Sequence, residues 1–332
     1  MTDTNSHNGL VLDVHAHFGP PGPASTELLA GARKTGEYAG PDVSWSPEQA
    51  IEFMDGHGID MQMLSFPMPL DAEKARMFNE YGASVVRAHP GRFGLLACIP
   101  MGDPDRAVAE IDHALTQLHA DGVILVSNYD GHYLGDARFE PAFEALDRLG
   151  ATVFIHPVTP AGFDLTALGL PGPLIEFPMD TARTVVNALW AGVFTRHPNI
   201  RVVLAHAGGV LPILAPRIAD LAPADWVPDP SGGEDAAGIA AQLGQLYCDT
   251  AIAATPASLE PLLRMIPRDH VVFGTDFPAA PMPSITAGLA ALKESVPLGG
   301  HGLDAIGPNA GALFPSAVDR WQHAAAAPSA PQ

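Results

Sequence analysis

The chain has 332 residues, of which 47% are hydrophobic and only 16% are charged, a composition that excludes a mainly disordered protein. The formal net charge of −20, from 17 basic and 37 acidic residues, argues against binding to nucleic acid or to anionic membranes. An anionic substrate would therefore need a local positive centre, such as a metal ion or an arginine.

The N-terminal segment is polar and lacks the apolar core of a signal peptide. No run of about 18 apolar residues is present, so we expect no membrane span. Cys98 and Cys248 lie inside apolar segments and are typical of reduced core residues. These features predict a cytoplasmic protein with a flexible N-terminus (1–9), a single domain (10–320) and a flexible C-terminal tail (321–332).

Short apolar runs, many of which end in a polar residue, alternate along the chain with amphipathic stretches. The runs predict eight strands, at Leu10–His15, Asp60–Phe66, Phe93–Ile99, Gly122–Val126, Ala151–His156, Ile200–His206, Gln245–Asp249 and His270–Asp276. The stretches between them predict helices over Pro47–His57, Ala72–His89, Pro104–Ala120, Pro141–Gly150, Asp180–Arg196, Val210–Leu221 and Pro256–Met265.

Strands that alternate with helices indicate parallel pairing through βαβ units. Eight such units in a chain of this length predict one α/β domain, a (β/α)8 TIM barrel. A doubly wound open sheet is the alternative, but no G-x-G-x-x-G motif follows the first strand. Three connections are long and rich in Gly and Pro: Gly19–Ser46, Val158–Phe177 and Ala222–Gly238. The first two follow strands one and five, so we expect these long loops over the C-terminal face of the barrel.

The clearest local motif is Asp13-Val14-His15-Ala16-His17, at the end of the first strand. Residues two apart in a strand share a face, so His15 and His17 point in the same direction. Two imidazoles so placed can bind one metal ion. An H-x-H pair alone is common and carries little weight.

Three further polar residues stand at the ends of predicted strands. His156 and His206 end the fifth and sixth strands, and Asp276 ends the eighth. A barrel gathers the C-terminal ends of its strands around one mouth. For any one of these residues packing is the simpler interpretation, but all five together favour a metal site.

These motifs together resemble the amidohydrolase superfamily, in the metal-dependent decarboxylase branch that includes aminocarboxymuconate-semialdehyde, γ-resorcylate and 6-methylsalicylate decarboxylases. The sequence is most similar to the 6-methylsalicylate type, and the resemblance runs from about Val11 to Phe314. It rests on His15-Ala16-His17, Phe154-Ile155-His156-Pro157, Ala205-His206-Ala207-Gly208-Gly209, Tyr247-Cys248-Asp249-Thr250 and Gly274-Thr275-Asp276-Phe277-Pro278.

The resemblance implies a role for each polar residue. His15, His17, His156 and Asp276 would ligate one divalent metal, while His206, beside it, or Asp276 would act as the catalytic acid or base. Arg217 would bind the substrate carboxylate, in its own or a neighbouring subunit of a homodimer. An ordinary surface arginine is an equally good interpretation of that residue.

The branch also guides the choice of metal. Some members carry Glu-x-His on the first strand, whereas this chain has His15-x-His17. A nitrogen-rich ligand set favours Zn²⁺, and an added carboxylate would suit Mn²⁺. The fourth strand ends in Val126-Ser127-Asn128 without a lysine, which argues against a two-metal hydrolase with a carbamylated lysine. No organic cofactor is expected.

We therefore expect a carboxy-lyase that releases CO2 from a small aromatic acid of the ortho-hydroxybenzoate kind or from an unsaturated carboxylic acid. Phe177, Phe277 and Asp249 are candidate substrate contacts, although packing or a strand-end cap would explain them equally well. A metal-dependent hydrolase of an ester, lactone, amide or C–C bond is the alternative, because the metal ligands alone serve either reaction. A binding or scaffold protein that kept the barrel is a third hypothesis, which the complete ligand set disfavours.

Overall fold

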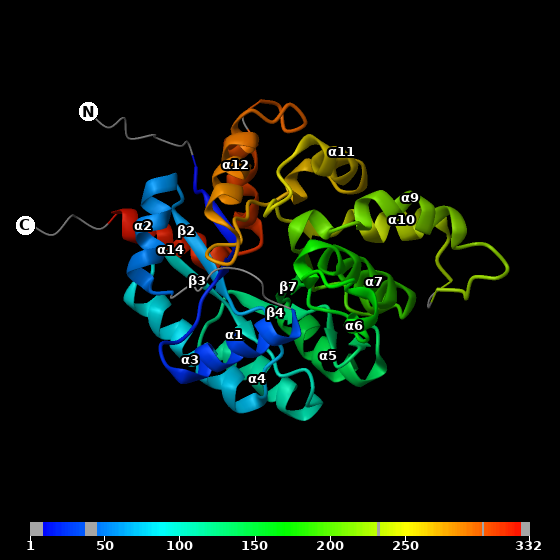
Figure 1. Cartoon of the computed structure of the whole chain (residues 1–332), viewed down its shortest axis with the longest axis horizontal. Coiled ribbons are helices and arrows are strands. Elements are labelled where there is room, and N and C mark those ends of the chain that lie inside the picture. Colours follow the sequence, from blue (N-terminus) through cyan, green and yellow to red (C-terminus); the bar gives the residue numbers. More distant parts are fainter. Residues whose placement is uncertain (1–8, 37–44, 231–232, 301, 327–332) are drawn as a thin grey trace, which may run out of the picture.

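The computed structural model describes residues 9–36, 45–230, 233–300 and 302–326. Its centre is a curled sheet of parallel strands surrounded by helices, as the barrel prediction requires (Figure 1). The sheet order is β1-β2-β3-β4-β7-β8-β9. These strands span Leu12–His17, Met61–Ser65, Phe93–Cys98, Gly122–Val126, Thr152–His156, Arg201–Leu204 and Tyr247–Cys248.

Strand residues of this sheet are buried almost throughout, with Arg201 and Tyr247 as the more accessible positions. Parallel sheets covered by helices on the outside and filled by side chains on the inside show this pattern. A separate two-stranded hairpin, which the sequence did not predict, follows β4. It comprises β5 (Asn128–Tyr129) and β6 (His132–Tyr133), which pair antiparallel.

The prediction of a regular eighth strand over His270–Asp276 is wrong in detail. The segment makes only single parallel bridges to its neighbours, between Cys248 and Val271 and between Ala16 and Phe277. It nevertheless occupies the position of an eighth strand, because its backbone bonds to β9 on one side and to β1 on the other. Asp276 has a φ of 62°, a left-handed conformation that a continuous strand does not allow.

The outer layer is helical, and several helices begin with Pro in the first turn or with a side-chain cap. Ser46, Asp71 and Asp103 each accept a hydrogen bond from the backbone N–H three residues later. The helices are α1 (Pro23–Thr35), α2 (Pro47–His57), α3 (Ala72–Ala88), α4 (Pro104–Thr116), α5 (Glu140–Leu149), α6 (Phe163–Thr166), α7 (Glu176–Trp190), α8 (Val193–Arg196), α9 (Leu211–Leu221), α10 (Ala236–Gly244), α11 (Pro256–Met265), α12 (Met282–Lys293), α13 (Gly302–Ile306) and α14 (Pro315–Ala326).

Short 3-10 helices complete the chain at Ala137–Phe139, Gly172–Leu174, His206–Gly208, Arg268–His270 and Gly307–Ala312. The long connections after the first and fifth strands carry helices of their own, α1 and α6. These connections meet where the Gly172 N–H donates to the Gly36 carbonyl at 2.9 Å. In the described part of the chain, no helix is long and apolar enough to cross a membrane.

Several expected boundaries differ from the structure, two of them with consequences for the site and for the domain limits. Helix α7 begins at Glu176, four residues before the predicted start, so Phe177 lies in its first turn. Helix α14 continues to Ala326, so the domain end expected at residue 320 falls inside a helix. The expected flexible N-terminus (1–9) and the last six residues fall outside the described residues, apart from Gly9.

Substitution of Gly274 tests how closely the last segment of the barrel packs against β1. A Cβ at this position would lie 2.9 Å from the His15 Cβ and 3.0 Å from the Asp249 Cβ. We expect Gly274→Ala to lower the free energy of unfolding of the metal-free protein by about 1–3 kcal/mol, the usual cost of overpacking. Denaturant unfolding measures this change.

Gly288→Ala is the matched control. Its Cβ would approach the Ala254 Cβ only to 3.8 Å, inside helix α12. Alanine is a better helix former than glycine, so this variant should be neutral or slightly stabilising. Equal stability of the two variants would contradict close packing at Gly274.

Candidate metal centre

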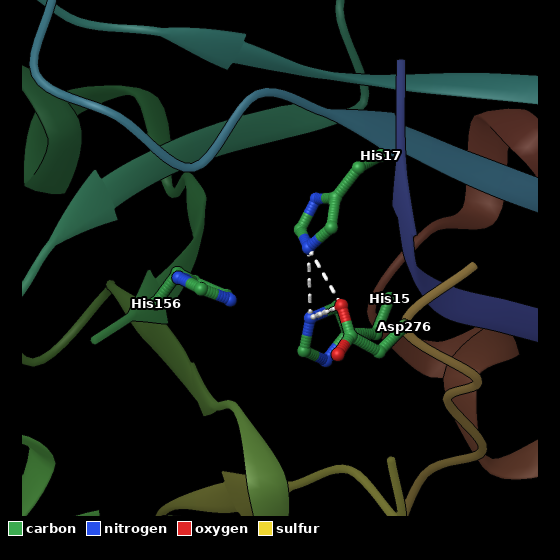
Figure 2. A group of neighbouring side chains, drawn as sticks. All are labelled: His15, His17, His156 and Asp276. Carbon is green, nitrogen blue, oxygen red and sulfur yellow. Dashed lines mark hydrogen bonds and ion pairs between the residues drawn. The ribbon is translucent and has the colours of Figure 1, made fainter. Parts of the chain in front are cut away.

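Four buried side chains converge at the C-terminal mouth of the barrel. His15 and His17 come from β1, His156 from the end of β7, and Asp276 from the segment that closes the barrel. One ligand atom from each lies within 4.8 Å of the others. Figure 2 shows His15, His17 and Asp276 linked together, with His156 facing them from the other side. The sequence predicted this group of four.

The separations within the group match those of ligands around one metal ion. The Nε2 atoms of His15 and His17 are 3.2 Å apart. The Asp276 Oδ1 lies 3.0 Å from the His17 Nε2 and 3.5 Å from the His15 Nε2. With metal–ligand bonds of about 2.1 Å, neighbouring ligands of a tetrahedral or octahedral ion lie about 3.0–3.4 Å apart.

Hydrogen bonds at the far side of each ring orient the imidazoles. The Nδ1 of His15 donates to the Asp249 Oδ2 at 2.6 Å, and the Nδ1 of His156 donates to the Pro157 carbonyl at 2.8 Å. The Nδ1 of His17 lies 3.1 Å from the Ser65 hydroxyl, which itself donates to the Ala16 carbonyl.

A proton on each Nδ1 leaves the three Nε2 lone pairs facing one another in a buried space. Facing lone pairs repel unless a cation or a proton lies between them, and imidazole nitrogen is a preferred ligand of Zn²⁺. The donor set therefore fits one divalent metal, with the second nitrogen of every histidine held by an acceptor, as in known metal sites.

The electrostatics of the group differ from one histidine to the next. Burial lowers the pKa of His17 and lowers that of His156 well below its ordinary value. Burial also acts to lower the pKa of His15, but the charge and hydrogen bond of Asp249, together with the charges of Asp276 and Asp13, raise the pKa of His15 to about 8. Burial opposes ionisation of Asp276, yet its hydrogen bond to His17 and the nearby imidazoles lower its pKa.

The sequence predicted Asp249 as a candidate substrate contact, but in the structure its side chain bonds to other residues of the site. Its side chain is fully buried, and one oxygen accepts the Nδ1–H of His15. The other oxygen accepts the backbone N–H groups of His206 and Ala251, each at 2.9 Å. The carboxylate therefore lies behind the metal-ligand group and orients it. The second cluster of potential ligands, His15, His206 and Asp249, is this hydrogen-bond network.

His206 lies beside the four ligands without belonging to their group. Its ring centroid is 4.8 Å from that of His15 and 5.6 Å from that of His156. Strand β8 ends at Leu204, so His206 stands in a following turn with a φ of 54° and not at the end of the strand as predicted. Its Nδ1 donates to the Ala251 carbonyl at 3.0 Å, which leaves Nε2 available for proton transfer.

The three remaining predicted residues, Phe177, Phe277 and Arg217, lie in different surroundings. The Phe177 ring packs edge-on against His156, with ring centroids 6.1 Å apart, and so adjoins the site. The Phe277 ring instead stacks on Phe53 of α2, with centroids 4.0 Å apart. Arg217 is exposed on α9, where Leu211 and Ala215 face the core and the arginine lies on the opposite side.

Two supporting residues were not selected as site residues from the sequence. Ser65 ends β2, and its hydroxyl oxygen accepts a hydrogen bond from the His17 Nδ1–H. The strand-end pattern could therefore have identified this residue. Asp13, noted in the first motif, supports the backbone. It accepts from the Thr275 hydroxyl at 2.6 Å and from Gln62 at 2.9 Å, and thereby holds the residue before Asp276. Burial raises the pKa of Asp13 to about 6.

Comparison with known proteins identifies the family of the chain. The amidohydrolase family model matches residues 12–304, and the chain belongs to that family. The chain is 34% identical over 319 residues to a 6-methylsalicylic acid decarboxylase of Aspergillus aculeatus, covering 92% of this chain and 96% of the relative. The resemblance seen in the motifs is thereby confirmed.

Solved structures share the fold. An amidohydrolase II crystal structure is 29% identical, with a TM-score of 0.79, and the match covers 92% of this chain and 99% of the other. A dihydroxybenzoic acid decarboxylase of a Polaromonas species, solved with bound manganese and an inhibitor, is 22% identical. Its TM-score is 0.75, with coverage of 92% and 97%. The TIM-barrel prediction is confirmed.

The raised pKa of His15 predicts how metal affinity depends on pH. In the metal-free protein the His15 Nε2 holds a proton below pH 8, and a metal ion must displace it. The pKa values of His17 and His156 are lowered, so these rings do not compete in the same way. Apparent Zn²⁺ affinity should rise about tenfold per unit up to pH 8 and then level off. Titration against a competing chelator at several pH values measures this.

Asp249→Asn is the informative variant for this prediction. It removes the charge that raises the pKa of His15, so the levelling-off should begin at a lower pH. Loss of a group that orients a ligand should also weaken metal binding by roughly 10–100-fold. A wild-type affinity that does not change between pH 6 and pH 8 would show that His15 carries no such proton.

Proposed function

We propose that this protein is a metal-dependent, non-oxidative decarboxylase of a small aromatic carboxylic acid with an ortho oxygen. The observation that carries the proposal is the convergence of three imidazole Nε2 atoms and one carboxylate at the mouth of an amidohydrolase barrel. Relatives at 32–34% identity that match most of the chain are named decarboxylases, two of them for 6-methylsalicylic acid.

The ligand set suits an anionic substrate in spite of the acidic chain. His15, His17, His156 and Asp276 would hold the ion, and one carboxylate against a +2 charge leaves the centre with a net charge of about +1. When bound, the metal supplies a positive centre for the carboxylate and the neighbouring ring oxygen. Phe177 would offer an apolar surface to the ring from the side of His156.

The reaction requires a proton at the ring carbon that carries the carboxylate. We propose that Asp276 or His206 delivers it. Asp276 belongs to the ligand group, and His206 lies beside that group. The His206 ring bonds to the Ala251 carbonyl through Nδ1, so its Nε2 is left to carry the proton. The carbon–carbon bond then breaks, its electron pair returns to the ring, and CO2 leaves. His206 is only partly buried, so it can regain a proton from solvent.

We propose Zn²⁺ as the metal, with Mn²⁺ as the alternative. Three imidazoles and one carboxylate form a nitrogen-rich set, which favours Zn²⁺. The manganese in the Polaromonas structure belongs to a protein that is similar in fold, and it is the reason to test both ions.

We also propose that the protein is a cytoplasmic homodimer in which Arg217 of one subunit serves the site of the other. Arg217 shares the outer face of α9 with Ile213, which is 66% exposed, so both side chains are open to a neighbouring subunit. Ile175, at the N-cap of α7, and Met179 on α7 are also exposed, and α7 packs against α9. Exposed apolar side chains on two neighbouring helices suit burial against a second copy.

Metal binding and catalysis should separate in two variants. We expect His17→Ala to lose metal and turnover together, because it removes a ligand atom. His206→Ala should keep the metal but lose roughly 10²–10⁴-fold in kcat, the usual contribution of an acid or base. Metal analysis and kinetics on the same samples measure both. An empty site in His206→Ala would mean that His206 is itself a ligand.

The reaction is tested with a panel of hydroxybenzoates in deuterated water. A decarboxylase releases CO2 and places one deuterium on the carbon that lost it, which mass spectrometry and NMR detect. A hydrolase would instead incorporate water oxygen into the product. Labelled oxygen in a product, with no CO2 from any hydroxybenzoate, would reject decarboxylation in favour of hydrolysis.

A further inference from the structure

Another buried carboxylate, Asp180 on α7, lies outside the metal-ligand group and has no role in the function proposed above. Its side chain is fully buried. Burial of a charge is costly unless hydrogen bonds replace the lost water, so the partners of Asp180 indicate what the residue holds in place.

Three neutral donors and one cation surround this carboxylate. The hydroxyls of Ser127 and Tyr133 donate to it at 2.5 and 2.6 Å, and the Asn128 amide donates at 2.8 Å. Arg183 approaches at 3.4 Å. We call Ser127, Asn128, Tyr133 and Asp180 the Asp180 clamp. It joins the end of β4 and the β5–β6 hairpin to helix α7.

The Asp180 clamp also holds the chain directly after a candidate metal ligand. The backbone N–H of Val158, two residues after His156, donates to the Ser127 hydroxyl at 3.0 Å. The Asn128 amide donates to the Thr159 carbonyl at 3.1 Å. The Ser127 backbone N–H donates to the His156 carbonyl at 2.9 Å. The segment between His156 and Thr159 is therefore fixed by the same side chains that bind Asp180.

Thr159, at the end of this segment, contacts Gly172 and Phe177 beside His156. Phe177, three residues before Asp180 on α7, packs edge-on against the His156 ring. A Cβ on Gly172 would meet the Thr159 methyl at 2.6 Å and the Phe177 ring at 3.1 Å, so these three residues are in close contact. Thr159, Gly172 and Phe177 form a wall that reaches the ligand group through the Phe177 ring beside His156.

We propose that Asp180 is a positioning residue that fixes this wall and thereby sets how tightly the aromatic ring of the substrate binds. The inference rests on the proposed function for the identity of the substrate. Asp180 does not contact the candidate ligands itself. Its loss should therefore weaken substrate binding, while metal content and the chemical step stay nearly unchanged.

Tyr133→Phe is the first test, because it removes one donor to Asp180 and keeps the ring. KM for a hydroxybenzoate that the wild type decarboxylates should rise by up to about fivefold, the limit reached if the whole free energy of the lost hydrogen bond is transmitted to substrate binding, with kcat nearly unchanged. Metal stoichiometry should stay at the wild-type value. Asp180→Asn should act in the same direction and more strongly. Tyr247→Phe, at a tyrosine of β9 stacked on His270, is the matched control and should leave KM unchanged.

Hydrogen exchange of the metal-loaded protein tests the Asp180 clamp without any substrate. Peptides that cover 157–160 and 176–180 should exchange faster in Tyr133→Phe than in the wild type or in Tyr247→Phe. Unchanged exchange, unchanged KM or loss of metal in Tyr133→Phe would each overturn the proposal. If the wild type released no CO2 from any hydroxybenzoate but exchange still rose in Tyr133→Phe, the proposed function would fail while the positioning role would stand.

Discussion

The arrangement of the site depends on the hydrogen bonds of one buried carboxylate, Asp249. It accepts the Nδ1–H of His15 with one oxygen and the backbone N–H groups of His206 and Ala251 with the other. The Ala251 carbonyl in turn accepts the Nδ1–H of His206. A candidate metal ligand, His15, and the adjacent candidate acid, His206, are thus fixed relative to one another. Catalytic groups need placement of this precision, because small displacements are costly to rate.

The same principle applies to the other rings of the site. His17 and His156 are each oriented through Nδ1, and their lowered pKa values keep them neutral and able to bind metal at neutral pH. In the absence of a metal, a proton on His15 is the simplest way to relieve the facing lone pairs, which agrees with its raised pKa. Proton and metal therefore compete for one nitrogen, and folding, metal uptake and pH are linked through it.

Backbone strain is found at this mouth as well as at four other non-glycine positions of the described residues. His206, Ala207 and Asp276 all have positive φ values near 60°, conformations that side chains rarely adopt. Each such residue costs about 1–3 kcal/mol and persists only where surrounding bonds determine it. Asp249 supports the turn of His206, and Asp13 supports Thr275 beside Asp276. Two buried carboxylates therefore hold the unusual backbone that presents two functional side chains, and strain at a site of this kind is common in catalysis.

The sequence alone determined the alternation of strands and helices and the convergence of His15, His17, His156 and Asp276. Both follow from local periodicity and from the rule that parallel strands of a barrel end at one mouth. The tertiary structure decided the irregular eighth segment, the direction of the Phe277 ring and the role of Asp249. These depend on a backbone turn at Asp276, on stacking against Phe53, and on a bond between His15 and Asp249, which are 234 residues apart. Periodicity reports only which face a residue occupies, whereas such contacts arise when distant segments pack together.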